Sequence, residues 1–200
     1  MNIRNNLSRI TKKPASRAAL QALVAVAAIT ATSTSAFAAV VCNNPVSIPV
    51  PQTVAGIYLN LVTGIFNSSP ASAPGWDFNP WGTGSIFFYE NNAASPMDGG
   101  VVTSGTTYAA LASGSPIGAG STYTRTGTAT TNWGAGVDAY LGIRFLNEGT
   151  AAINYGWIHI MTTGPTTGLP ATILGYCYDN TGADIMAGTT PVSLKNFSVD

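Results

Sequence analysis

The sequence contains few residues that could carry out chemistry. It has a single histidine, His159, and two cysteines, Cys42 and Cys177, among its 200 residues. One histidine excludes the usual histidine-rich zinc site and any relay that needs two imidazoles. Only 8% of the residues are charged, and no G-x-S-x-G nucleophile elbow occurs. We therefore expect a non-enzymatic protein with no catalytic residues, no cofactor and no bound metal.

Two catalytic alternatives have little support in the sequence. A Ser–His–Asp relay would require Asp138 or Asp179 to orient His159, but no serine stands in a recognisable nucleophile turn. A glycoside hydrolase would require two carboxylates at a defined separation, whereas the eight acidic residues are scattered singly, mostly in turn-like segments. The simpler interpretation makes His159 a half-exposed residue on a strand.

Calcium binding is an alternative for one loop. Residues 179–184 read D-N-T-G-A-D, and side-chain oxygens of this kind are the ligands that calcium prefers. The loop lacks an acid or amide at Ala183, however, where alternating ligands would need one. A plain hairpin turn is the simpler interpretation.

The first 38 residues have the pattern of a secretory signal peptide. Basic residues precede an apolar, alanine-rich stretch over residues 18–31, and Ala36-Phe37-Ala38 supplies the small residues that a signal peptidase needs. The apolar stretch is shorter than the roughly 20 residues that cross a bilayer, which disfavours a membrane anchor. Lipidation of Cys42 is also disfavoured, because Ala39 and Val41 do not fit the residues that precede an acylated cysteine.

Removal of the signal peptide would leave an acidic protein. Only three basic residues, Arg125, Arg144 and Lys195, would remain against eight acidic ones. Nucleic acid is then a poor partner, because its binding requires a basic patch. Few charges among many Thr, Ser, Asn and Gly residues suit a secreted, periplasmic or cell-envelope protein without a membrane anchor in its mature chain. We expect polysaccharide or other copies of the chain as partners.

Residues 39–200 are long enough for one domain of ordinary size. Cys42 and Cys177 both lie in it, and export would place them in an oxidising compartment, so we expect them to form a disulfide. The bond would close a loop of about 135 residues, for which the loop-entropy model gives on the order of 4–5 kcal/mol. The alternative is two buried free thiols.

Residues 137–188 predict a β-meander of three strands. Runs rich in aromatic and β-branched residues flank a turn at 147–150, and a third run follows a Gly/Pro-rich loop at 164–170. Alternation gives each strand one plainly apolar face, which is typical of a sandwich. The expected groups that share a face are Leu141, Ile143 and Phe145; Tyr155, Trp157 and His159; Gly156, Ile158 and Ile160; Ile173, Gly175 and Cys177; and Leu174, Tyr176 and Tyr178.

The rest of the chain predicts shorter elements. We expect an edge segment at 46–51, strands at 55–64, 85–90, 101–103, 122–125 and 183–187, a loop at 67–80, a helical turn at 108–111, and a final edge strand or tail at 192–200. The strand at 85–90 has apolar residues on both faces, as expected between two packed layers. No long amphipathic helical pattern occurs after the signal peptide, so the predicted fold is all-β, an antiparallel β-sandwich of the jelly-roll-like kind.

Trp76, Trp81 and Trp133 fall in segments rich in Gly, Pro and Asn, which we expect to be loops. A loop tryptophan either packs as a cover on the core or presents its ring as a platform on which a sugar can stack. A platform would indicate a carbohydrate-binding module. We expect at least two of the three to cover the core.

Four short motifs agree in order and spacing with a known group of proteins. They are Leu141-Gly-Ile-Arg-Phe, Asn154-Tyr-Gly-Trp-Ile-His-Ile, Leu174-Gly-Tyr-Cys-Tyr-Asp and Ile185-Met-Ala-Gly. In them the chain resembles the exported domains of bacterial PEP-CTERM surface proteins. The Pro-Glu-Pro signal, membrane helix and basic tail of those proteins do not occur in residues 193–200, so sorting and anchoring do not carry over.

The resemblance implies an exported β-sandwich of envelope or matrix type, and it transfers no catalytic residues. Our leading hypothesis is a secreted, non-enzymatic cell-surface or extracellular-matrix component. A carbohydrate-binding module that uses the three tryptophans is the alternative.

Export is expected to remove the chain up to Ala38, because signal peptidase cleaves after small residues that follow an apolar stretch. N-terminal sequencing of the exported protein should find Ala39 first. A chain that still begins at Met1, or a lipidated Cys42, would contradict this prediction.

Overall fold

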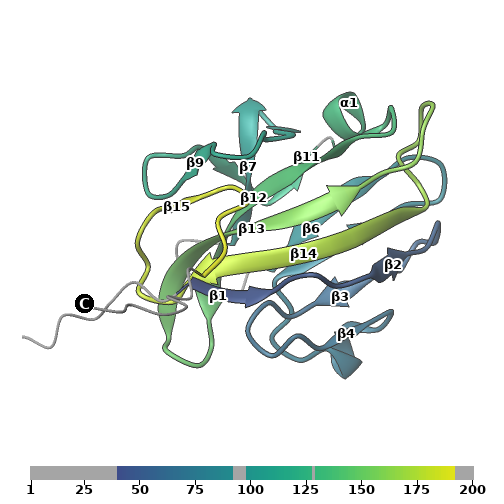
Figure 1. The fold of residues 1–200 in the computed structure, drawn as a ribbon. Helices are drawn as coiled ribbons and strands as arrows, with labels where there is room; N and C mark the ends of the chain where they lie inside the picture. Colours follow the sequence, from purple (N-terminus) through teal and green to yellow (C-terminus); the bar gives the residue numbers. More distant parts are fainter. Residues whose placement is uncertain (1–39, 92–97, 128, 192–200) are drawn as a thin grey trace, which may run out of the picture. The chain divides into compact units, whose positions relative to one another are not determined.

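The computed structural model describes residues 40–91, 98–127 and 129–191. The expected signal peptide and the expected edge strand at 192–200 lie outside these residues. The described chain forms two antiparallel sheets that face each other, and a small two-stranded sheet (Figure 1). The predicted class, an all-β antiparallel sandwich, is confirmed. No helix in the described part of the chain is long and apolar enough to cross a bilayer.

The larger sheet is built around the predicted meander, which is confirmed. Its order is β1-β14-β13-β12-β7-β10, with β2 also paired to β14 and β8 paired to β7. Figure 1 shows β1 and β2 one after the other along the same edge of β14. The strands are β1 (Val40–Asn43), β2 (Ile48–Val50), β7 (Gly99–Ser104), β8 (Thr107–Tyr108), β10 (Tyr123–Thr124), β12 (Asp138–Asn147), β13 (Ala152–Met161) and β14 (Ala171–Asp179).

The smaller sheet has five short strands in the order β11-β6-β5-β3-β4. These are β3 (Tyr58–Leu59), β4 (Phe66–Asn67), β5 (Phe78–Trp81), β6 (Phe87–Glu90) and β11 (Thr126–Gly127). The two-stranded sheet pairs β9 (Pro116–Ile117) with β15 (Ile185–Met186). Two short helical segments complete the described chain, the 3-10 helix η1 (Pro70–Ser72) and the helix α1 (Thr130–Trp133).

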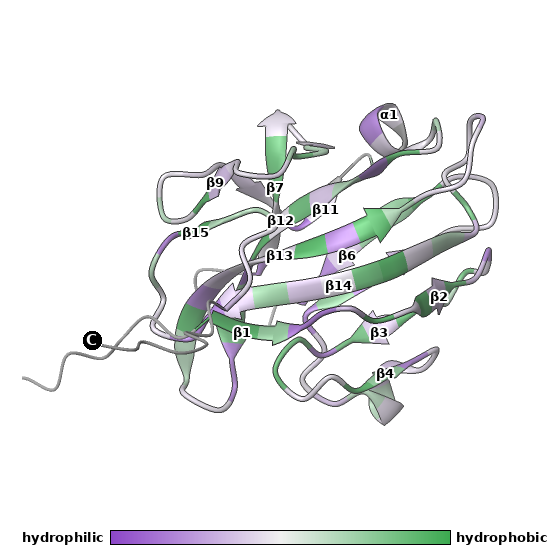
Figure 2. Ribbon diagram, viewed as in Figure 1, coloured by the Kyte–Doolittle hydropathy of each residue, from purple (hydrophilic) through white to green (hydrophobic). Residues whose placement is uncertain are grey.

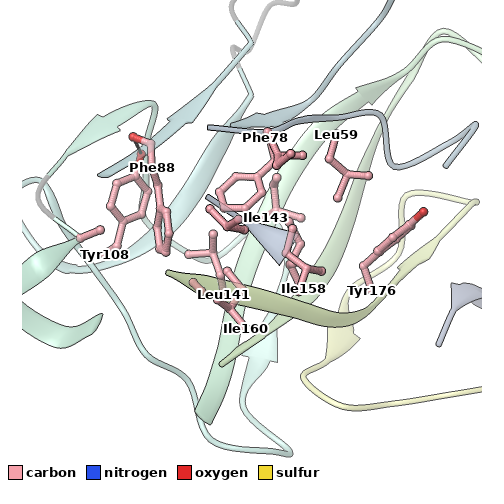
Figure 3. Packing of buried hydrophobic residues seen from close by; sticks show 14 of the residues in the cluster. Leu59, Phe78, Phe88, Tyr108, Leu141, Ile143, Ile158, Ile160 and Tyr176 are labelled. Atoms are coloured by element: carbon pink, nitrogen blue, oxygen red, sulfur yellow. Dashed lines mark hydrogen bonds between the residues drawn. The ribbon is translucent and has the colours of Figure 1, made fainter. Parts of the chain in front are cut away.

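The main core lies between the two sheets. Figure 3 shows Leu59 and Phe78 of the smaller sheet close to Ile143 and Ile158 of the larger one, and all four side chains are fully buried. Burial of one such side chain contributes about 1.5–3 kcal/mol. In Figure 2 the hydrophobic colour recurs along β13 and β14, as expected for strands that bury apolar side chains.

The outer face of the larger sheet is covered by a second, smaller core. Trp157 and Cys177 point to this side and are buried with Ile117 of β9 and Ile185 of β15. The Trp157 indole N–H donates a hydrogen bond to the carbonyl oxygen of Thr189 at 3.1 Å. The two-stranded sheet therefore protects a face that would otherwise expose aromatic side chains.

The predicted faces hold for β12 and β13 but not for all of β14. The pairing of β14 with β13 shifts register between His159 and Ile160, where the ladder passes from Gly175 directly to Ile173. This irregularity turns Ile173 into the main core beside Tyr176. The prediction that Ile173 shares a face with Cys177 is therefore wrong, because an extra residue in one strand inverts the alternation beyond it.

Three predicted elements differ in the structure. The loop expected over 67–80 is shorter, because residue 67 already belongs to β4 and residues 78–80 belong to β5. The strand expected over 55–64 ends after Leu59, because the side-chain oxygen of Asn60 accepts hydrogen bonds from the backbone N–H groups of Val62 and Thr63 and forms a turn. The helical turn expected at 108–111 is wrong. Instead, Tyr108 belongs to β8 and Leu111 forms an isolated bridge with Tyr140.

Cys42 and Cys177 form a disulfide, as predicted. They are direct partners in the pairing of β1 with β14, and their Cα atoms lie 4.1 Å apart. Since β1 lies at the edge of the sheet, the bond attaches the first described strand to the last long one across 135 residues.

Replacing both cysteines, Cys42→Ala with Cys177→Ala, should lower the free energy of unfolding by about 3–5 kcal/mol, because the unfolded chain regains the entropy of an open loop. Urea denaturation measures this loss. Dithiothreitol should reduce the stability of the unmodified protein to a similar level and leave the double variant unchanged. Two alkylatable thiols in native, unreduced protein would disprove the pairing.

Candidate functional site

The outer face of the smaller sheet carries an aromatic surface. Along β5, Phe78 is buried in the main core and the alternate residues Asn79 and Trp81 point outward. Along β6, the outward residues are Phe87 and Tyr89. The register places Trp81 opposite Phe87 and Asn79 opposite Tyr89, so that these side chains are neighbours on one face.

The aromatic rings on this face form two groups. Trp81 and Phe87 stack with ring centroids 5.0 Å apart and an interplanar angle of 26°. Trp76 packs against Tyr58 at 5.0 Å and against Tyr89 at 5.7 Å. Each ring is thus held by a neighbour, which limits the rotamer freedom that a ligand would otherwise have to remove.

An open groove of about 380 Å³ lies over these residues. It is lined by Tyr58, Trp81, Phe87, Phe88 and Tyr89, together with Val54, Asn79 and Thr126. None of these eight residues is charged. Phe87 is 37% exposed and Val54 is 72% exposed, so the groove presents apolar surface directly to solvent.

Asn79 supplies a fixed polar group in this apolar groove. Its Nδ2 donates hydrogen bonds to the carbonyl oxygens of Ala55 and Ile57, both at 2.9 Å. Its Oδ1 accepts no hydrogen bond from any residue that the structure describes. Tyr89 of β6 lies between Asn79 and Thr126 of β11, with which it pairs. The guanidinium of Arg125 lies 5.0 Å from the centre of the Tyr89 ring.

The structure separates the three candidate tryptophans. Trp81 lines the groove, and it is the last residue of β5 rather than a loop residue as predicted. Trp76 does lie outside the strands and packs against the rings of Tyr58 and Tyr89. Trp133 ends α1, is fully buried and contacts Phe88 in the main core. Trp133 therefore covers the core and cannot stack on a sugar, so the three do not form one platform.

Sequence reasoning missed Tyr58, Phe87 and Tyr89. The strand at 85–90 was expected between two packed layers, but this is wrong, because within the described residues its outer face has no layer over it and Phe87 is exposed. The alternation of Phe87 and Tyr89 with Phe88 and Glu90 was the available signal. It shows that the strand has two faces, but it cannot show that one of them is open.

His159 is a partly exposed strand residue, in agreement with the simpler interpretation. Its side chain is 23% exposed and its Nε2 lies 2.5 Å from Oδ1 of Asp138. The ring of Tyr140 stacks on the imidazole at 4.6 Å. Among the described residues, no serine hydrogen-bonds to His159, so a Ser–His–Asp relay is not assembled there.

The loop at 179–184 forms a turn held by its own side chain. Oδ1 of Asp179 accepts hydrogen bonds from the backbone N–H groups of Thr181 and Ala183. The second acid of the loop, Asp184, accepts from the N–H of Ala119 instead. The described ranges contain no cluster of three or more His, Cys, Asp or Glu residues suited to a metal.

Three further acidic residues, Asp77, Glu90 and Asp98, are buried like Asp179 of the turn, although turn-like positions were expected for most acids. Asp77 accepts a hydrogen bond from the N–H of Leu61 at 2.7 Å, and Glu90 accepts one from the Tyr108 hydroxyl at 2.6 Å. Burial raises the pKa of Asp77 and of Glu90 well above the usual values, and it raises the pKa of Asp98 to about 6. None of the three lines the groove.

No protein-family model, no curated protein sequence and no solved structure matches this chain. The resemblance to PEP-CTERM surface proteins stays a prediction, and any function has to be proposed from the site itself.

The raised pKa of Asp98 predicts that stability decreases as the pH rises. The folded protein favours the protonated carboxyl, so the contribution is fully present below the ordinary value of 3.8 and is lost as the pH passes through about 6. Asp98→Asn keeps the oxygen that accepts from the N–H of Leu146 and cannot ionise. Between pH 4 and pH 7, the free energy of unfolding measured by urea denaturation should decrease by about 1–2 kcal/mol less in this variant than in the unmodified protein. The same decrease in both proteins would contradict the prediction.

Proposed function

We propose that this protein is an exported, non-enzymatic β-sandwich of the cell surface or extracellular matrix, and that it binds polysaccharide through the groove on its smaller sheet. The observation that carries the proposal is the aromatic outer face of β5 and β6, which is open to solvent and contains one fixed amide. Contiguous apolar surface that stays exposed to solvent marks interaction sites and ligand-binding grooves.

The chemistry of the groove suits a sugar. A pyranose ring has apolar C–H groups on its faces and hydroxyl groups around its edge, so it stacks on an aromatic ring and hydrogen-bonds at its rim. Trp81 and Phe87 offer apolar surface, while Asn79 and Thr126 offer polar atoms in the same groove. Apolar walls with a few placed polar groups are the general pattern of ligand sites.

Binding is favoured over catalysis by the residues that line the groove. None of them is an acid, a histidine, a cysteine or a serine, and these are the side chains that most hydrolases use. The disulfide between Cys42 and Cys177 is compatible with a location outside the cytoplasm, in line with the expected signal peptide.

The proposal predicts that Trp81→Ala and Phe87→Ala each weaken polysaccharide binding about tenfold or more, because one good stacking contact is worth about 1–2 kcal/mol. Native affinity gels with hydroxyethylcellulose, xylan, soluble starch and dextran measure the binding. Since both side chains are partly exposed, the melting temperature should change little.

Trp133→Ala is the matched control, since it removes a tryptophan that lies in the core. We expect it to lower the free energy of unfolding by about 3–5 kcal/mol and to leave glycan affinity unchanged while the protein is folded. Absence of binding to all four polysaccharides would overturn the proposal. Concentration-dependent dimers that Phe87→Ala dissociates would assign the groove to a second copy of the chain.

A further inference from the structure

The groove contains one polar acceptor whose direction is set by the protein. This inference rests on the proposed function and names the class of sugar. We infer that Asn79 selects an uncharged, flat sugar ring of the β-glucose type, by accepting a hydrogen bond from one ring hydroxyl while Trp81 and Phe87 hold the apolar face of the sugar.

The amide of Asn79 cannot rotate freely. Both N–H bonds of its Nδ2 are engaged, one by the carbonyl of Ala55 and the other by the carbonyl of Ile57. The residue as a whole is only 3% exposed, yet it lines the groove. Its Oδ1 accepts no hydrogen bond from any described residue and is therefore available to accept one from a ligand.

A ligand that covers the groove would remove water from this acceptor. An acceptor that is buried without a donor costs about 1–3 kcal/mol. A sugar that places a hydroxyl against Oδ1 avoids this cost, whereas a ring with an ether at the same position does not. Sites built around such a group reject analogues that lack the donor.

The positions of the neighbouring side chains fit one sugar ring. Asn79, Tyr89 and Thr126 lie in a row on three adjacent strands, about 4.8 Å from strand to strand. Trp81 and Phe87 lie two residues further along the same strands, about 6.6 Å away. A flat ring with equatorial hydroxyls can thus contact the aromatic pair while its edge reaches Asn79.

The absence of charge among the groove residues favours a neutral sugar. A carboxylate covered by these eight residues would lose its hydration without a charged partner in the lining, and such burial is costly. Arg125, a cation next to the groove residue Thr126, packs against the Tyr89 ring and interacts electrostatically with the buried Glu90. An acidic polysaccharide that uses Arg125 is the contrary outcome of the test below.

The test compares three polymers with one β-glucan backbone, namely hydroxyethylcellulose, densely substituted methylcellulose and carboxymethylcellulose. The unmodified protein should bind hydroxyethylcellulose at least tenfold more tightly than methylcellulose, which lacks most hydroxyl donors, and more tightly than the charged carboxymethylcellulose. Affinity gels and isothermal calorimetry at two salt concentrations measure the three affinities.

Asn79→Ala should reduce the preference for free hydroxyls to below about threefold, as expected when this fixed acceptor is lost. Asn67→Ala is the matched control, because Asn67 is an exposed amide on β4 that does not line the groove. If Asn79→Ala does not fold, the comparison of the three polymers on the unmodified protein still tests the inference.

The possible outcomes separate the two proposals. Equal affinity for hydroxyethylcellulose and methylcellulose, or tightest binding to carboxymethylcellulose, would overturn the inference and leave polysaccharide binding standing. Binding to starch or dextran with none to the cellulose ethers would do the same. Absence of binding to every glycan would overturn both.

Discussion

The pairing of β12 with β13 is the constraint on which the rest of the fold depends. Ten consecutive residue pairs keep one register, from Asp138 opposite Met161 to Asn147 opposite Ala152. Because side chains alternate along a strand, this register decides which of them face the smaller sheet. A slip of one strand by one residue would exchange its buried and outward sets, and each large apolar side chain exposed would cost about 1.5–3 kcal/mol.

The two outer faces of the sandwich differ in whether another element covers them, and the groove lies on the face that is left open. Over the larger sheet, β9 and β15 bury Trp157 beneath a second core. Over the smaller sheet, no described element buries Trp81 and Phe87 in the same way, and they stack on each other instead. The inner side of the same strands holds Phe78 and Phe88 in the main core, so a rigid layer supports the exposed rings.

Prediction from the sequence succeeded where inward and outward side chains alternate over many residues. It failed where one side chain or one extra residue interrupts this alternation. Leu141 and Phe145 lie on a ten-residue strand and are buried on the expected face. The strand expected at 55–64 is short because the side chain of Asn60 accepts hydrogen bonds from nearby backbone N–H groups. In β14, the residues before Gly175 face the opposite side from the one predicted, because the pairing with β13 shifts by one residue there. Strand propensity is an average over many residues and does not detect such local events.

The sequence by itself determined the all-β class, the three long strands and the disulfide, because these depend on period-two alternation and on there being only two cysteines. Only the tertiary structure decided that Trp133 is buried, that Trp81 faces a groove and that Tyr58, Phe87 and Tyr89 join it. All three tryptophans have similar neighbours in the chain. Their exposure depends on which sheet packs over them, and that packing is set by strands far away in the sequence.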